Sequence, residues 1–188
     1  MKGIVFNLLE EVVTQEHGDQ TWDLLLDQAG VQGAYTSLGS YPDAELLALV
    51  QAASAALKVP SQDVVRWFGR NAMSLLAKRY PHFFEPHRTL VSFLLTLNEI
   101  IHPEVRKLYP GANVPVFDFR IRGENAVELR YISRRRLCAL AEGFVEGAAA
   151  VFGETVSIEQ PRCMHRGDDH CLLVCQSSSQ VAAAGRVA

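Results

Sequence analysis

Residues 98–122, NEIIHPEVRKLYPGANVPVFDFRIR, hold the point at which the sequence changes from a helical pattern to a strand pattern. Up to Gly111 the apolar residues recur at the spacing of one helix face, and beyond it they alternate with polar residues. His102 lies beside the apolar stripe, and Pro103 follows it directly. Because proline lacks an amide hydrogen and restricts the preceding residue, it cannot donate to the carbonyl of Glu99 and disfavours helical geometry at His102. We therefore predict either a local break in the helix at His102 or only a kink there.

The residues before this stretch predict a helical N-terminal part. The segment TWDLLLDQAG reads as a helix that Thr21 caps and Gly30 ends. Further helices are expected to start at Pro42 and at Ser61, which suits an N-cap. The longest helical pattern covers residues 89–111 and predicts one helix that leads into the opening stretch.

The residues after Gly111 predict strands around one helix. VFDFRIR and AVELRYIS flank the turn GEN and read as a hairpin. RRLCALAEGFVEGAAAVFG is helical again, and TVSIEQPRC and HCLLVCQ read as two more strands. The sequence thus predicts an α+β fold, with a helical N-terminal subdomain and a C-terminal subdomain of antiparallel sheet and helices. We expect one domain over residues 1–178, with its helical part ending at about residue 85, and a flexible tail at 179–188.

Composition excludes several classes of function. The 188 residues are 48% hydrophobic and 21% charged, with a formal charge of −3, so a general nucleic-acid surface is not expected. No apolar segment reaches the roughly 18 to 20 residues of a membrane span. The start of the chain turns acidic at once and lacks the features of a signal peptide, so we expect a cytoplasmic protein.

Two local features offer binding chemistry. A neutral imidazole such as that of His102 has one lone pair for a metal or haem iron. Tyr131, Ser133 and Arg135 occupy alternate positions of a predicted strand, and their side chains should face the same way and donate hydrogen bonds to an anion with carboxylates. Taken alone, each feature also has a structural reading: a core histidine with a satisfied hydrogen bond, and a half-exposed strand edge.

In combination, these features resemble the H-NOX family, the haem nitric oxide/oxygen binding domains related to the haem domain of soluble guanylate cyclase. The chain has a histidine after a long helix, a proline at 115 and then Tyr-x-Ser-x-Arg, besides the MKG start and a YPG that closes the helix. The resemblance extends from MKG to the CQ at 175–176 and is to the bacterial stand-alone type. It implies haem b between the two subdomains. The implied contacts are His102 on the iron, Tyr131, Ser133 and Arg135 on the propionates, and Pro115 against the porphyrin. Pro103 departs from the family pattern.

The resemblance also implies which gas is bound. In relatives, stable O2 binding goes with a distal tyrosine, and the matching position here is Leu140. The other distal residues that it implies are Val5, Leu9, Ala72, Leu76 and Phe144. Because none of these side chains is a strong donor, we expect ferrous haem that binds NO and CO but does not bind O2 stably.

The resemblance further implies signalling through a separate protein. Stand-alone relatives act on a histidine kinase or on a diguanylate cyclase or phosphodiesterase of cyclic-di-GMP. The sequence contains no nucleophile elbow, P-loop or His-Glu-x-x-His motif, and we do not expect an enzyme.

Four cysteines lie in the last part of the chain and raise a second possibility: Cys138, Cys163, Cys171 and Cys175. In a reducing compartment such a cluster suggests metal binding or redox sensing. The first three match positions that hold a structural zinc in some bacterial relatives, and the fourth ligand position is Gln160 here. His165, His170 or Cys175 could replace it. The alternative function is therefore a thiol or zinc redox sensor, and buried free cysteines remain the structural reading.

Overall fold

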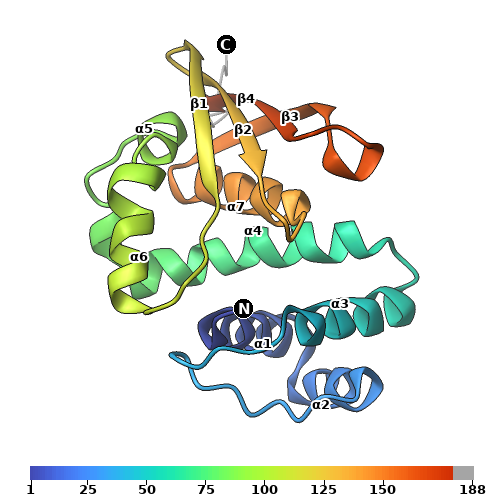
Figure 1. Cartoon of the computed structure of the whole chain (residues 1–188). Coiled ribbons are helices and arrows are strands. Elements are labelled where there is room, and N and C mark those ends of the chain that lie inside the picture. The colour runs from blue at the N-terminus through green and yellow to red at the C-terminus, as the bar shows by residue number, and fades with distance from the viewer. Residues whose placement is uncertain (180–188) are drawn as a thin grey trace, which may run out of the picture.

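The computed structural model describes residues 1–179 and confirms an α+β fold (Figure 1). The regular elements, in chain order, are α1 (Gly3–His17), α2 (Asp19–Ala29), α3 (Asp43–Leu57), α4 (Ser61–Arg79), α5 (Leu90–Leu94), α6 (His102–Leu108), β1 (Val116–Gly123), β2 (Ala126–Ile132), α7 (Cys138–Val151), β3 (Glu154–Arg162) and β4 (Cys171–Ser179). The 3-10 turns η1 (Pro81–Phe83) and η3 (Met164–Arg166) and a π-helix, η2 (Leu97–Ile101), complete the list. No helix within residues 1–179 has the length and apolar character needed to cross a membrane.

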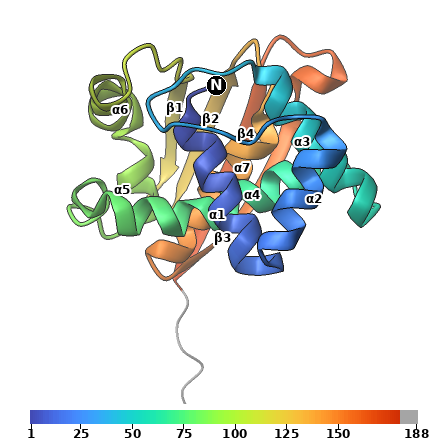
Figure 2. The same ribbon diagram turned by 90° about the horizontal axis from the view of Figure 1, so that it is seen from below.

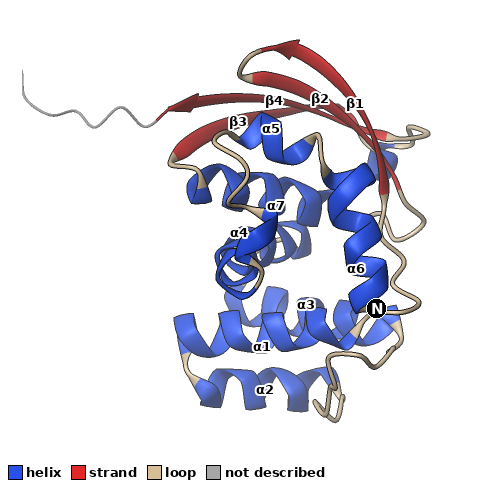
Figure 3. Cartoon of the chain, turned by 90° about the vertical axis from the view of Figure 1, so that its left-hand side faces the viewer, coloured by secondary structure: helices blue, strands red, loops and turns tan. Residues whose placement is uncertain are grey.

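The four strands form one antiparallel sheet in the order β1-β2-β4-β3. The hairpin predicted for β1 and β2 and the two later strands are confirmed. In Figure 3 the sheet forms one layer, α7 and α4 lie beneath it, and α1, α2 and α3 form the layer farthest from it. Strand β4 includes Ser179, so the prediction that the flexible tail starts there is wrong, because that residue pairs with Glu154. The rest of the predicted tail lies outside the described residues.

Some predicted helix starts differ from the structure by a residue or two. Helix α2 begins at Asp19, and the Thr21 hydroxyl donates to the His17 carbonyl oxygen (2.7 Å) instead of capping the helix. Helix α4 begins at Ser61 itself, after Pro60, without a side-chain cap. Gly30 ends α2 as predicted, with a left-handed backbone (φ 66°) that favours glycine.

Helices α4 and α7 pack against each other at unusually short distance. A Cβ atom on Gly143 would lie 2.1 Å from the Arg66 carbonyl oxygen, and one on Gly147 would lie 2.4 Å from that of Arg70. Real Cβ atoms do not approach so closely, and only glycine permits this contact at these two positions. The contact joins the sheet layer, which α7 supports, to the helical layers.

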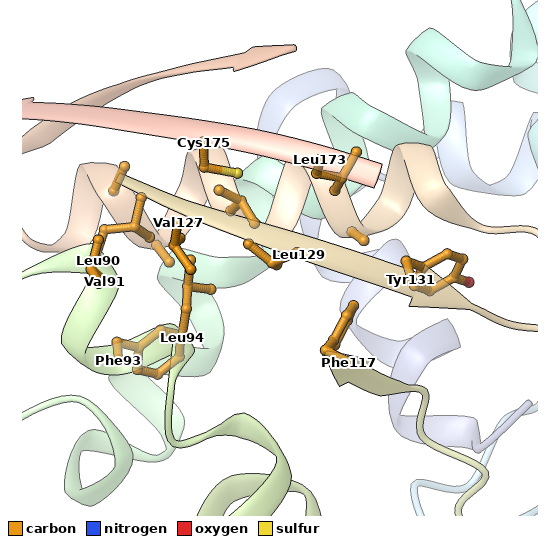
Figure 4. Packing of buried hydrophobic residues seen from close by; sticks show 14 of the residues in the cluster. Leu90, Val91, Phe93, Leu94, Phe117, Val127, Leu129, Tyr131, Leu173 and Cys175 are labelled. Atoms are coloured by element: carbon orange, nitrogen blue, oxygen red, sulfur yellow. The ribbon is translucent and has the colours of Figure 1, made fainter. Parts of the chain in front are cut away.

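Two large clusters of buried hydrophobic residues lie on either side of α4. One fills the space among α1, α2, α3 and α4, and Figure 2 shows these helices from below the sheet. The other lies between the sheet, α5 and α7, and Figure 4 shows its packing. Leu76 and Phe144 are only partly buried and pack against both clusters. These two residues therefore mark the boundary between the clusters.

Candidate functional site

A cavity of about 300 Å³ lies at this boundary. Side chains from α1, α4, α6, α7, β1 and β2 line it, and most of its wall is apolar. The polar side chains on the wall belong to Tyr80, His102, Tyr109, Asn113, Tyr131, Ser133 and Arg135. A largely apolar pocket of this size with few polar groups is typical of ligand and cofactor sites.

His102 reaches the cavity from an irregular helical segment. The predicted single helix over residues 89–111 is wrong, because the chain runs through α5, the π-helix η2 and then α6. In η2 the N–H of Ile101 donates to the carbonyl of Thr96 (3.1 Å), and the N–H of His102 donates to that of Leu97. Both bonds span five residues instead of four. The chain returns to α-helical spacing at Pro103, which has no N–H to place in either pattern.

The predicted break therefore lies before His102 and not at it. His102 keeps helical backbone angles (φ −65°, ψ −37°), and the prediction that Pro103 moves it out of helical geometry is wrong. Proline is tolerated in the first turn of a helix, where its missing N–H has no partner to lose. Here α6 starts at His102, which places Pro103 in the first turn.

The imidazole of His102 is mostly buried and chemically available. Its Nδ1 atom is buried and has no hydrogen-bond partner among the described residues. Burial, reinforced by the positive charge of Arg106, lowers the pKa of His102 to about 4, although the backbone of Pro115 acts in the opposite direction. The ring is therefore neutral at physiological pH and retains a lone pair. Pro115 and Phe117 line the cavity beside it, and the Phe117 ring centroid lies 5.9 Å from that of His102.

Tyr131, Ser133 and Arg135 line the same cavity, but only Tyr131 belongs to a strand. Strand β2 ends at Ile132, and the chain then turns, with a left-handed residue at Arg136 (φ 51°), before α7. The prediction of a single strand face is therefore wrong for Ser133 and Arg135. The Tyr131 hydroxyl accepts a hydrogen bond from the N–H of Leu137 (3.1 Å), and burial raises the pKa of this phenol.

Arg135 already has two protein partners in the structure. Its Nε donates to Asp43 Oδ2 (2.6 Å), and its Nη1 donates to the Asn113 carbonyl oxygen (2.7 Å). Partial burial favours the protonated form of Asp43, but hydrogen bonds from Arg135 and from the Met1 amine outweigh it and lower the pKa of this carboxyl. The sequence analysis did not find Asp43, since it lies 92 residues from Arg135 and reads as an ordinary helix start.

The predicted distal residues divide into two groups. Val5, Leu76, Leu140 and Phe144 line the cavity. Leu9 and Ala72 do not line it and lie in the buried cluster among α1 to α4. Their helical neighbours Leu8 and Met73 line it instead, because adjacent positions on a helix point about 100° apart.

Tyr80 and Tyr109 form a second polar group on the wall that the sequence analysis did not find. They follow the last residues of α4 and α6, and their hydroxyl groups are hydrogen-bonded to each other. Burial, together with this bond, raises the pKa of Tyr109 to about 12. The pair connects the ends of two helices on opposite sides of the cavity.

Three cysteines lie together at the start of α7, and none of them lines the cavity. The Sγ atoms of Cys138 and Cys163 are 3.8 Å apart, those of Cys163 and Cys171 are 3.9 Å apart, and all three thiols are buried. Burial raises the pKa of Cys138 and raises that of Cys171 to about 12. All three sulfurs lie within 4.8 Å of one another, a spacing that a metal ion could bridge.

A fourth ligand is not present in this group among residues 1–179. His165 is engaged by the Arg136 carbonyl oxygen (2.7 Å), and His170 by the Asp169 carboxylate (2.5 Å). Cys175 lies on the same strand as Cys171 but outside the group, and the Gln160 amide nitrogen is buried without a partner. Since structural zinc takes four ligands, the residues present provide an incomplete zinc site.

Comparison with known proteins places this geometry in a family. The profile of the haem-NO-binding family matches residues 2–160. An H-NOX protein from S. oneidensis, solved in the Fe(II)NO ligation state, is 37% identical, with a TM-score of 0.89 over 95% of this chain and 100% of that chain. The Fe(II)CO form of an H-NOX domain from Shewanella oneidensis is also 37% identical, with a TM-score of 0.85 over 95% of this chain and 99% of that one.

A structure with lower sequence identity has the same fold. The unliganded Fe(II) form of an H-NOX protein from K. algicida is 25% identical, with a TM-score of 0.85 over 96% of this chain and 98% of that chain. No curated protein sequence gives a significant match. Since the family profile covers most of the chain and the identity to solved members reaches 37%, the chain belongs to the haem-NO-binding family, the family of the H-NOX proteins.

Proposed function

We propose that the cavity binds haem b through His102 and that the protein is a sensor of nitric oxide. The observation that carries this proposal is a partly buried, neutral imidazole on the wall of a largely apolar cavity, whose buried Nδ1 has no hydrogen-bond partner among the described residues. The apolar wall suits a porphyrin face, and the imidazole suits its iron. When bound, haem supplies a ferrous iron that takes up small diatomic gases. The relatives from S. oneidensis were solved in Fe(II)NO and Fe(II)CO states, which supports the same ligands here.

Tyr131, Ser133 and Arg135 are proposed to hold the haem propionates. They gather at one end of the cavity, and each can donate a hydrogen bond to a carboxylate. Arg135 would have to share its guanidinium between a propionate and Asp43. Pro115, next to the histidine on the wall, is proposed to pack against the porphyrin.

Selectivity for NO and CO over O2 is proposed to come from the apolar distal wall. The side chains of Val5, Leu76, Leu140 and Phe144 carry no hydrogen-bond donor, and Leu8 and Met73 add none. A bound O2 is polar and is stabilised by a donor, whereas NO and CO need one far less. Tyr80 and Tyr109 also line the cavity, and the bond between their hydroxyl groups occupies the hydrogen of one of them.

Transmission of the signal is proposed to require a separate protein, a histidine kinase or an enzyme that makes or degrades cyclic-di-GMP. The protein itself is proposed to have no catalytic activity of its own. The cavity lies between two hydrophobic clusters, so a change at His102 would alter how the two clusters pack and would alter the outer surface.

The test is an absorption spectrum of the reduced, haem-loaded protein in air and then with NO. We expect a Soret band that does not change to that of an oxygen complex in air and that shifts on addition of NO. His102→Gly should lose or strongly alter the band, and His17→Gly, at the exposed end of α1, is the matched control. A stable oxygen complex would contradict the selectivity, and a spectrum insensitive to His102→Gly would contradict haem binding through this residue.

A second candidate function uses the three-cysteine group. The close approach of Cys138, Cys163 and Cys171 favours oxidation between two thiols or release of a bound metal ion as a redox signal. Metal analysis well below one zinc per chain would contradict the zinc form. With a partner protein in hand, a response that survives His102→Gly but not Cys163→Ser would favour the thiols over haem.

A further inference from the structure

The side chain of Asn98, in the π-helix η2, is bonded to the backbone of strand β1. Its Nδ2 donates to the Phe117 carbonyl oxygen, and its Oδ1 accepts from the Phe117 N–H (3.1 Å). Strand β1 lies at the edge of the sheet, so its outward backbone groups have no neighbouring strand. One asparagine amide thus takes the place of a strand partner for both backbone groups of Phe117.

Phe117 connects this amide to the cavity. Its ring centroid lies 5.9 Å from that of His102 and 5.8 Å from that of Tyr131. Figure 4 shows Phe117 and Tyr131 at the same end of their two strands. The Phe117 ring is therefore a shared support for the imidazole and for Tyr131, and its backbone is held by Asn98.

The segment that carries His102 has few other attachments to the sheet. Among residues 1–179, the two bonds of Asn98 are the only side-chain hydrogen bonds that join η2 or His102 to β1. The π-helical backbone next to them has already changed its hydrogen-bond spacing, and π-helical turns are rare and often lie at functional sites. Asn98 is not itself on the cavity wall, so it can act on a ligand only through its neighbours.

We propose that Asn98 is the positioning residue for His102: its amide fixes the π-helical segment and the Phe117 ring together, and so sets how firmly the imidazole holds haem iron. This inference rests on the proposed haem ligation by His102. Loss of the amide would leave His102 on the cavity wall but free to tilt away from the sheet. The bond between imidazole and iron would then be weaker in the unliganded protein and easier to break when NO binds.

Three variants separate hydrogen bonding from packing. Asn98→Leu keeps the approximate size and removes both bonds. Asn98→Asp keeps the acceptor for the Phe117 N–H and places an oxygen against the Phe117 carbonyl. Asn98→Gln keeps both groups on a longer arm and should restore the wild-type behaviour in part. Asn71→Leu is the matched control, because the side chain of Asn71 donates only to the carbonyl of Trp67 in its own helix.

Two measurements report on the proposal. Hydrogen exchange in the haem-free protein should be about tenfold faster at the Phe117 amide in Asn98→Leu, since a lost hydrogen bond corresponds to roughly a tenfold change, and nearly unchanged in Asn98→Asp. In the reduced, haem-loaded protein, the iron–histidine stretching frequency should fall in Asn98→Leu and Asn98→Asp. The fraction of the NO complex that has lost its histidine should rise in both variants. Asn71→Leu should change none of these readings.

The outcomes distinguish the two proposals. A wild-type protein without an iron–histidine band that depends on His102 would overturn the proposed function. A wild-type band that is unchanged in frequency and NO response in Asn98→Asp would overturn the positioning role and leave haem binding intact. If Asn98→Leu does not fold, the Asp and Gln variants still decide, because a purely structural role predicts equal iron–histidine frequencies in both.

Discussion

The α4–α7 contact and the segment that carries His102 both border the cavity, and they are built in opposite ways. Helices α4 and α7 have 19 and 14 residues and unbroken hydrogen bonding, and they touch backbone to backbone at glycines. The chain from Leu90 to Leu108 consists of three short pieces with two hydrogen-bond spacings. The long helices give the cavity a fixed wall, whereas the histidine lies on a segment that side chains hold in place. The α4–α7 pair is thus the rigid part of the cavity wall, and the segment that carries His102 is the part that can change when a ligand binds.

The largest effect should come from spoiling the fixed wall. Gly143→Leu would force α4 and α7 apart, because a side chain there meets the Arg66 backbone and not a flexible neighbour. We expect the free energy of unfolding to fall by more than about 3 kcal/mol, above the usual range for overpacked positions, because the clash is with backbone atoms. Urea denaturation measures it, with Gly123→Ala as control, since nothing lies within 4 Å of a Cβ at Gly123. A small loss in Gly143→Leu would mean that the wall is as adaptable as the His102 segment.

The next effect concerns the charge state of His102 in haem-free protein. Its pKa is about 4 in the fold against an ordinary 6.5, so the unfolded chain takes up a proton first as the pH falls. Stability is then highest above about pH 6.5 and declines as the pH falls toward 4, by about 3 kcal/mol for this group alone. Unfolding of wild type and His102→Leu at about pH 7 and about pH 4 should show that the variant lacks this loss. Equal losses in both proteins would show that the imidazole is not held neutral by burial.

Pro103 offers a smaller and more local change. Pro103→Lys adds an N–H that could extend α-helical hydrogen bonding back to the carbonyl of Glu99, in place of the π-helical spacing that precedes α6. We expect this to stabilise regular helix around His102 by about 1 kcal/mol and to slow the loss of histidine from the NO complex about fivefold. Stopped-flow spectroscopy with NO measures the rate. An unchanged rate would make Pro103 only a tolerated residue of a first helical turn.

The smallest effect is expected at Asp43, whose partner Arg135 ties α3 to the turn before α7. Both side chains are partly exposed, so Asp43→Asn should lower the free energy of unfolding by less than about 1 kcal/mol near neutral pH. The pKa of Asp43 lies below its ordinary value of 3.8, so this contribution is present above that value and disappears as the pH falls below it. Urea denaturation of wild type and Asp43→Asn should show a difference in the free energy of unfolding near neutral pH and none at a pH well below 3.8. A larger loss at low pH than at neutral pH would contradict the ion pair.

The sequence predicted elements better than their junctions. The β1–β2 hairpin and the two later strands could be predicted because alternation and turn residues are local signals. The break of the His102 helix into α5, η2 and α6 could not, since a π-helical spacing leaves no clear pattern in apolar residues. Pro103 indicated the correct region of the chain. However, it lies where α-helical spacing resumes and not where the break begins.

The candidate site was predictable only as far as the resemblance reached. His102, Tyr131, Ser133 and Arg135 do come together on one cavity. The hydrogen bonds around them join residues that are distant in the sequence: Asp43 with Arg135, Asn98 with Phe117, and Tyr80 with Tyr109. Such pairs have no local signal in a single sequence. The exchange of Leu9 for Leu8 and of Ala72 for Met73 has the same origin, because helix rotation is set by packing.

The hydroxyl bond between Tyr80 and Tyr109 joins residues 29 positions apart and closes a loop that includes His102. Tyr80 follows the last residue of α4, and Tyr109 follows the last residue of α6. The chain between them is therefore held at both ends. A segment that is held at both ends cannot open by rotating about a hinge at one end. It can still bend or twist, but near η2 and His102 such motion is limited by the two Asn98 bonds to β1 and by the nearby Tyr109 end.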